Sequence, residues 1–179
     1  MTQTQNEKRK PSSRAQVEGT QNDIFVSPTF GPLKFEEVVE KLIKYHNQDL
    51  DFPYRIVIGT DSQEVKAEGT NFVTAIICHR VGAGGIYFWR KTNGIVTHSL
   101  RQRILQEAIY SLELAEELTQ NLVKKGLLEN NLEIHVDIGH TGPTREMISE
   151  VTGMIRASGF AVRIKPESYG ATKVADRHV

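Results

Sequence analysis

RIVIGTDSQEV, residues 55–65, passes within a few positions from an apolar run to a polar one. Residues 56–58 are Ile, Val and Ile, a β-branched run that predicts the middle of a buried strand. Residues 59–62 are Gly, Thr, Asp and Ser, so the predicted strand ends on the carboxylate of Asp61. In a sheet covered on both faces, such a carboxylate faces either open water or a functional site. The rest of the sequence is needed to distinguish a solvated aspartate from a site residue.

The residues after this strand predict a mixed α/β fold. FVTAIICH (72–79) and GIYFWRK (85–91) are rich in β-branched and aromatic residues, and the short glycine-containing turns make the three strands an antiparallel meander. Strands and helices then alternate, which is typical of a mixed sheet with helices on both faces. The elements predicted for this second half are a helix from Ser99 to Val123, a strand over 132–139, a helix from Pro143 to Ser158, a strand over 160–165 and a short helix from Ser168 to the C-terminus.

The chain before this sheet divides into two parts. Residues 1–23 are polar with almost nothing to bury, so we expect a disordered tail there and a single domain over 24–179. Residues 35–46 carry apolar side chains at helical spacing, which predicts an amphipathic helix that docks on the sheet.

Composition limits the classes of protein that fit. Lys+Arg and Asp+Glu are both 22, so the formal net charge is zero and any site for a polyanion has to be a local patch. The single cysteine, Cys78, cannot form an intrachain disulfide, and no run reaches the length of a membrane span. Residues 1–23 also lack the apolar region of a signal peptide. We therefore expect a cytoplasmic location and no membrane partner.

Two aspartates follow apolar runs of the predicted sheet. Asp61 ends the first strand and Asp137 ends the fourth, LEIHVDIG (132–139). If these two strands are parallel neighbours, both carboxylates lie at the same edge, where ligands gather in such sheets. Adjacent carboxylates repel unless a cation or a shared proton stabilises them, and hard divalent cations prefer oxygen ligands.

The long helix offers a third acidic residue. At about 100° per residue, Leu114 and Leu118 project within roughly 20° of Glu107, so this glutamate lies in the edge of the apolar stripe. It could belong to a site, or it could pair with Arg103 one turn back and reach the surface. Glu116 also enters the apolar arc and is the rival candidate.

Asp176 lies close to the C-terminus, in KVADRHV. By helical spacing it points away from the face made by Ala171, Val174 and Ala175. A solvated aspartate therefore fits the spacing at least as well as a site residue does.

The combined pattern resembles the ribonuclease-H-like superfamily, and more narrowly the YkuK-type ribonuclease-H-like proteins. The stretches that carry the resemblance are YRIVIGTDSQ (54–63), EIHVDIG (133–139) and RIKPESYGATKVADR (163–177), within about residues 30–179. The resemblance implies a five-stranded mixed sheet in the order 3-2-1-4-5. The helix over 35–46 lies outside the minimal core of that superfamily.

The resemblance also implies a set of site residues. Asp61, Glu107 in QEAIYSLE (106–113), Asp137 and Asp176 match the four acidic positions of the superfamily. These four carboxylates would hold two Mg²⁺ or Mn²⁺ ions for the hydrolysis of phosphodiester bonds.

The leading hypothesis is therefore a metal-dependent nuclease that acts on RNA, RNA–DNA hybrid or structured DNA. One alternative is a non-catalytic module that keeps the fold and binds nucleic acid or protein, because a fold does not fix a function. Another is a non-nuclease phosphoryl-transfer enzyme that shares the metal but not the polymer. The zero net charge argues against tight nonspecific binding of nucleic acid, since phosphate contacts supply most of that affinity.

Overall fold

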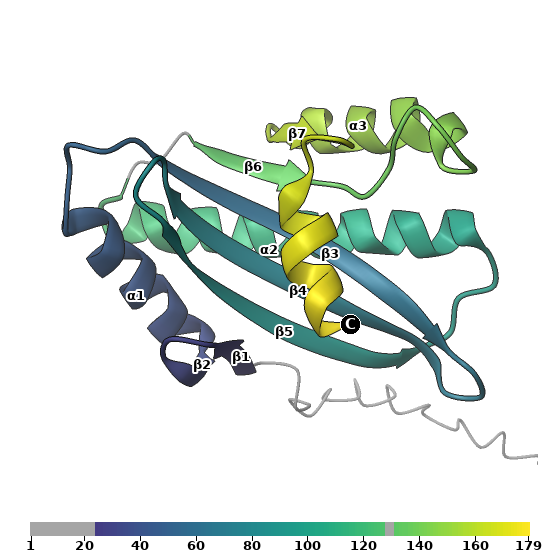
Figure 1. Ribbon diagram of the computed structural model, residues 1–179, viewed down its shortest axis with the longest axis horizontal. Helices are drawn as coiled ribbons and strands as arrows, with labels where there is room; N and C mark the ends of the chain where they lie inside the picture. The colour runs from purple at the N-terminus through teal and green to yellow at the C-terminus, as the bar shows by residue number, and fades with distance from the viewer. Residues whose placement is uncertain (1–23, 128–130) are drawn as a thin grey trace, which may run out of the picture.

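The strands form one sheet in the order β2-β1-β5-β4-β3-β6-β7 in the computed structural model, which describes residues 24–127 and 131–179 (Figure 1). The tail predicted over 1–23 lies outside the described residues. None of the described helices is long and apolar enough to cross a membrane.

The centre of the sheet is the predicted antiparallel meander. It consists of β3 (Tyr54–Val65), β4 (Gly69–Arg80) and β5 (Gly85–Ile95). The strands are longer than predicted because backbone pairing continues past the apolar runs, with Asp61 opposite Val73 and Val65 opposite Gly69. The prediction that Asp61 ends its strand is therefore wrong, since Asp61 lies inside β3.

Two parallel strands complete the predicted core of the sheet. β6 (Leu132–His135) pairs with β3, and β7 (Ala161–Arg163) pairs with β6. The order β5-β4-β3-β6-β7 is the predicted order 3-2-1-4-5, so the mixed α/β class is confirmed. β6 and β7 are both shorter than predicted, and beyond them single backbone bonds join Val136 N–H to Arg163 O and Lys165 N–H to Ile138 O.

The sheet has seven strands where five were predicted. The additional hairpin, β1 (Ile24–Ser27) and β2 (Gly31–Lys34), joins the edge of the meander where Val26 pairs with Trp89. Each added strand has only four residues, and β2 contains a proline, so neither carries a strong strand pattern.

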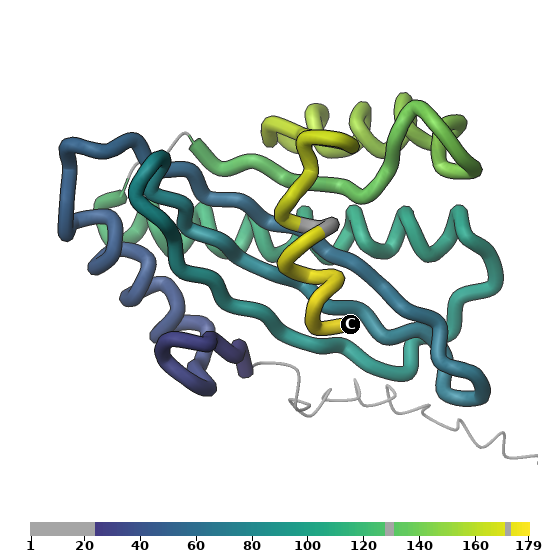
Figure 2. Tube along the Cα trace, in the orientation of Figure 1, coloured from purple at the N-terminus to yellow at the C-terminus, as the bar shows by residue number. Residues whose placement is uncertain are grey.

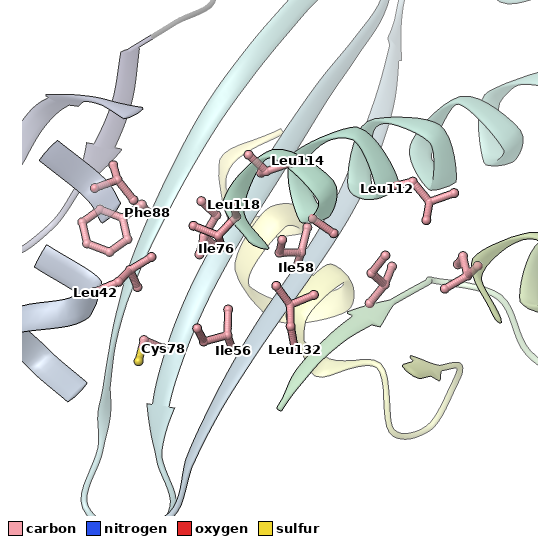
Figure 3. Close-up of a cluster of buried hydrophobic side chains, with 14 of the residues drawn as sticks. Leu42, Ile56, Ile58, Ile76, Cys78, Phe88, Leu112, Leu114, Leu118 and Leu132 are labelled. Atoms are coloured by element: carbon pink, nitrogen blue, oxygen red, sulfur yellow. The ribbon is translucent and has the colours of Figure 1, made fainter. Parts of the chain in front are cut away.

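Three helices cover one face of the sheet and share its main core: α1 (Phe35–Asn47), α2 (Leu100–Lys124) and α3 (Ile148–Ala157). Figure 3 shows Leu114 and Leu118 of α2 against Ile58 and Ile76 of the sheet. All four side chains are completely buried. Such burial stabilises the fold by about 1.5–3 kcal/mol per large aliphatic side chain.

The ends of the helices agree with the sequence in part. α2 begins after its predicted cap, since the Gln102 N–H donates to Ser99 Oγ over 3.1 Å. The helix predicted from Pro143 begins later, because a 3₁₀ turn, Arg145–Met147, precedes α3.

The C-terminal segment crosses the opposite face of the sheet, over β3 and β4 (Figures 1 and 2). It consists of a π-helix, η3 (Gly170–Ala175), and a 3₁₀ turn, η4 (Asp176–His178), where one short helix was predicted. Ala175 is fully buried in a small second core with Val73 and Ala75. Helical segments thus lie on both faces, as predicted.

Candidate active site

The site begins where β6 leaves β3. The last paired residues of these parallel strands are Gly59 and His135, and Asp61 and Asp137 each lie two residues further along. The shared register brings the two aspartates to the same level of the sheet. They are close enough for the charge of Asp137 to raise the pKa of Asp61.

Glu107 reaches the same place from α2. Its side chain is only 3% exposed, and the Ser62 hydroxyl donates to Glu107 Oε1 over 2.5 Å. Ser62 follows Asp61 in β3, so its side chain points to the face that α2 covers. The rival Glu116 is exposed to solvent, which leaves Glu107 as the acidic residue of α2 that meets the two aspartates.

Asp176 approaches Asp61 from the opposite face. It lies at the start of η4, and it is close enough to Asp61 to raise the pKa of that carboxyl group. An open pocket of about 220 Å³ borders both aspartates and is also lined by Ser62, Gln63 and Val179. Asp61 thus interacts with each of the other three predicted acidic residues, with Glu107 on the face that α2 covers and Asp176 on the opposite face.

Burial, together with the neighbouring charges, raises the pKa of two of these carboxyl groups. Burial raises the pKa of Asp61 from 3.8 to about 6, and the charges of Asp137 and Asp176 add to the rise, against the Ser62 backbone N–H. Burial raises the pKa of Glu107 from 4.5 to about 8. The Ser62 hydroxyl and Arg103 lower that pKa, whereas Asp61 and Asp137 raise it. Two of the four carboxyl groups therefore carry a proton more readily than usual.

Two oxygens of the site have no hydrogen-bond partner among the described residues. They are Glu107 Oε2 and Asp137 Oδ1, and both atoms are buried. A buried, unpartnered carboxylate oxygen is costly unless a cation or a donor reaches it. This donor set of oxygens fits a hard divalent cation such as Mg²⁺ or Mn²⁺.

The carboxylates already have other partners in this arrangement. Lys165 Nζ lies 2.8 Å from Asp137 Oδ2, Ser62 bonds Glu107, and Asp61 contacts Asp176. Across residues 24–127 and 131–179, no three acidic, histidine or cysteine side chains stand in a group that could hold a metal ion as they are placed. Binding of a cation would therefore require some of these side chains to change partners.

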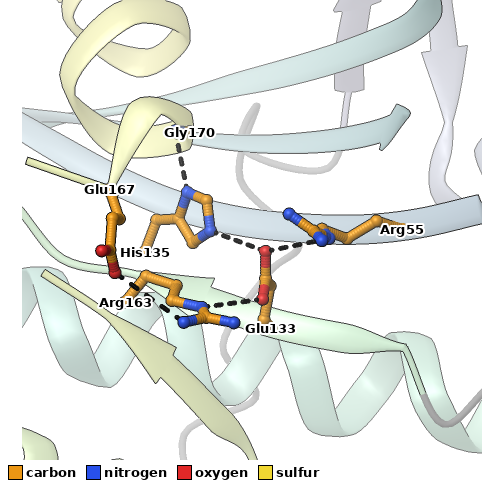
Figure 4. A network of polar contacts seen from close by, with 6 residues as sticks. All are labelled: Arg55, Glu133, His135, Arg163, Glu167 and Gly170. Atoms are coloured by element: carbon orange, nitrogen blue, oxygen red, sulfur yellow. Dashed lines mark hydrogen bonds and ion pairs between the residues drawn. The ribbon is translucent and has the colours of Figure 1, made fainter. Parts of the chain in front are cut away.

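A polar network around the buried side chains of His135 and Glu133 holds the start of the C-terminal segment (Figure 4). The Gly170 N–H donates to His135 Nδ1 over 3.0 Å, so Nδ1 accepts and the ring proton is on Nε2. His135 Nε2 lies 3.0 Å from Glu133 Oε1, and Arg55 and Arg163 flank the same carboxylate. Burial lowers the pKa of His135, which keeps the ring neutral and able to accept from Gly170.

Glycine is required at position 170 by this close approach. A Cβ there would lie 2.5 Å from Val57 Cγ1 and 3.2 Å from His135 Nδ1, and both side chains are buried. At the far end of the segment, the His178 ring stacks on Trp89 with centroids 4.5 Å apart. Asp176 therefore lies between two anchored points even though it is close to the C-terminus.

Sequence reasoning did not single out the residues that position Glu107. Ser111 Oγ lies 2.8 Å from Thr60 Oγ1 and donates to Glu107 O over 2.9 Å, which ties this turn of α2 to β3. Strand alternation could have indicated Ser62, since Thr60 and Ser62 share the face of β3 opposite to Asp61. Ser111 carried a weaker signal, because it lies one turn after Glu107 on the same side of the helix.

Comparison with known proteins agrees with this architecture. Residues 37–179 match the family described as Ribonuclease H-like. The chain is also similar to "Uncharacterized protein YkuK" of Bacillus subtilis (strain 168), at 34% identity over 168 residues, which covers 86% of this chain and 95% of that protein. No solved structure gives a significant match. This likeness supports a nuclease-type or nucleic-acid-related role, and the chain belongs to the ribonuclease H-like family.

Proposed function

We propose that this protein is a divalent-metal-dependent nuclease that hydrolyses phosphodiester bonds in RNA, RNA–DNA hybrid or structured DNA. The observation that carries the proposal is that Asp61 of β3 interacts with three further carboxyl groups: Glu107 of α2, Asp137 just beyond β6 and Asp176 of η4. Family membership and the unpartnered oxygens of Glu107 and Asp137 support it further.

Each acidic residue would have a distinct part in binding Mg²⁺ or Mn²⁺. Asp61 lies in the rigid ladder of β3 and Asp137 just beyond β6, so these two would be the central ligands. Glu107 is oriented by Ser62, and Asp176 would close the site from the C-terminal segment. When bound, two such ions supply an activated water and stabilise the leaving 3′ oxygen.

Proton release would accompany metal binding. A Glu107 pKa of about 8 keeps that carboxyl largely protonated at neutral pH before any cation arrives. A ligand carboxylate has to lose its proton, so we expect metal binding at neutral pH to release protons and to strengthen as the pH rises.

The test is cleavage of labelled RNA, DNA and RNA–DNA hybrid with Mn²⁺ or Mg²⁺ and with EDTA. We expect metal-dependent cleavage by the wild type and a loss of about 100-fold or more in Asp61→Asn, because that variant lacks a central charge of the site. The matched control is Asp51→Asn, an exposed turn aspartate, which should cleave normally. Full metal-dependent cleavage by Asp61→Asn would remove the proposal.

A non-catalytic nucleic-acid-binding module is the second candidate. The ion pair between Lys165 and Asp137 favours it, because this lysine already neutralises one carboxylate without a metal. The two candidates differ in their response to cations, since a ligand that binds only the folded state raises the melting temperature. Equal melting temperatures in EDTA and in millimolar Mn²⁺ would favour the binding module.

A further inference from the structure

Lys165 places a positive charge directly on the acidic site. Its Nζ atom lies 2.8 Å from Asp137 Oδ2, and the two side chains are 51% and 25% exposed. The contact thus joins a largely buried carboxylate to an amine that keeps access to solvent.

The backbone holds this lysine beside the site. The Lys165 N–H donates to Ile138 O over 2.8 Å, which fixes its position next to Asp137. Gly139 leaves room for the lysine stem, because a Cβ at that position would lie 3.1 Å from Lys165 Cβ. Asp137 therefore meets Lys165 as a result of how the chain is anchored, while the four-carbon stem leaves the amine free to turn.

A divalent cation and this ammonium group would both bind the carboxylate of Asp137. The remaining oxygen, Asp137 Oδ1, is buried and has no hydrogen-bond partner among the described residues. A cation bound there would lie across one carboxylate from the ammonium group, and two positive charges so close repel each other. Lys165 can leave toward solvent, whereas Asp137 cannot.

We propose that Lys165 competes with the divalent cation for Asp137 and that, once displaced, its ammonium group contacts a phosphate of the nucleic acid. The inference rests on the function proposed above. The observation that carries it is the ion pair itself, which holds one carboxylate oxygen of the site before any metal binds. It also adds a positive contact for the substrate beside Asp137.

The test separates the two parts of the proposal. Lys165→Met removes the charge but keeps an unbranched side chain, and Lys173→Met, an exposed lysine of the C-terminal segment, is the matched control. In calorimetric titrations with Mn²⁺ alone, we expect Lys165→Met to bind about fivefold more tightly than the wild type, and the control to bind as the wild type does. Lys165→Arg keeps the charge and should restore the weaker binding.

The second part is measured with labelled RNA and DNA in Ca²⁺. Lys165→Met should bind them more weakly and lower the slope of log K against log salt by about one, as expected for one lost phosphate contact. Unchanged affinity and slope would overturn the phosphate contact. Mn²⁺ binding by Lys165→Met that is equal to or weaker than that of the wild type would overturn the competition.

The proposal can fail separately from the proposed function. If the wild type binds Mn²⁺ and cleaves while Lys165→Met behaves like it in both titrations, only the role of Lys165 is wrong. If the wild type shows no saturable Mn²⁺ binding, the metal-dependent function is wrong and this inference with it. Melting temperatures of all variants in EDTA show that each is folded during the titrations.

Discussion

Replacing Glu107 by glutamine should change how stability depends on pH. Glu107 is buried, and its pKa rises from 4.5 to about 8 in the folded protein. Between pH 4.5 and about pH 8, the folded state binds more protons at Glu107 than the unfolded chain does. The free energy of unfolding therefore falls as the pH rises toward 8. Glutamine has nearly the same shape but does not titrate. Glu107→Gln should therefore lack this part of the pH dependence.

The size of the effect follows from the two pKa values. At 1.36 kcal/mol per pKa unit, the full shift corresponds to roughly 5 kcal/mol, present below pH 4.5 and lost above pH 8. Between pH 6 and pH 9 the linkage relation gives a loss of about 2.7 kcal/mol for the wild type relative to Glu107→Gln. His135 is present in both proteins, so its contribution cancels in the difference.

The assay is urea denaturation in EDTA at several values between pH 6 and pH 9. The quantity compared is the difference in unfolding free energy between the wild type and Glu107→Gln. Glu113→Gln, an exposed position of the same helix, should keep the pH dependence of the wild type. A difference between wild type and Glu107→Gln that stays constant across the range would refute the raised pKa of Glu107 and the burial that is its main cause.

Two further variants test how the C-terminal segment holds Asp176. Gly170→Ala should lower the unfolding free energy by about 1–3 kcal/mol and weaken Mn²⁺ binding, because its Cβ would overlap Val57. Denaturation measures the unfolding free energy and calorimetry the Mn²⁺ affinity. If neither value changes, the packing of Gly170 against Val57 is contradicted. Trp89→Ala should lower the unfolding free energy by about 1–3 kcal/mol and weaken Mn²⁺ binding, since His178 loses its stacking partner, whereas Trp89→Phe should retain most of both. Equal Mn²⁺ affinity in Trp89→Ala and the wild type would show that the stack does not position Asp176.

Alternation of strands and helices after a meander was sufficient to predict a mixed sheet. The order of the core strands was implied by the resemblance to the ribonuclease-H-like superfamily, and the structure has this order, with the strand before Asp137 parallel to that of Asp61. The length of β3 was not predictable from its apolar run, because pairing with β4 carries the strand through polar residues as far as Val65. The hairpin of β1 and β2 was missed because its strands are too short to carry a pattern.

The acidic residues show where reasoning from periodicity ends. Glu107 and Glu116 both fell in the apolar arc of α2, and the tertiary structure distinguishes them, since Glu107 is buried and bonded to Ser62 of β3 whereas Glu116 is exposed. For Asp176 the spacing of 100° per residue did not apply, since the segment before it is a π-helix rather than an α-helix. The ion pair of Lys165 with Asp137 depends on tertiary structure and has no signal in local spacing.

The central claim is that the four carboxylates form a divalent-metal centre. Its most direct test is calorimetric titration of the wild type and Asp61→Asn with Mn²⁺ at neutral pH, in the absence of nucleic acid. We predict saturable binding of about two ions per chain by the wild type and loss of binding in Asp61→Asn. No saturable binding by the folded wild type, or the same binding by both proteins, would contradict the account.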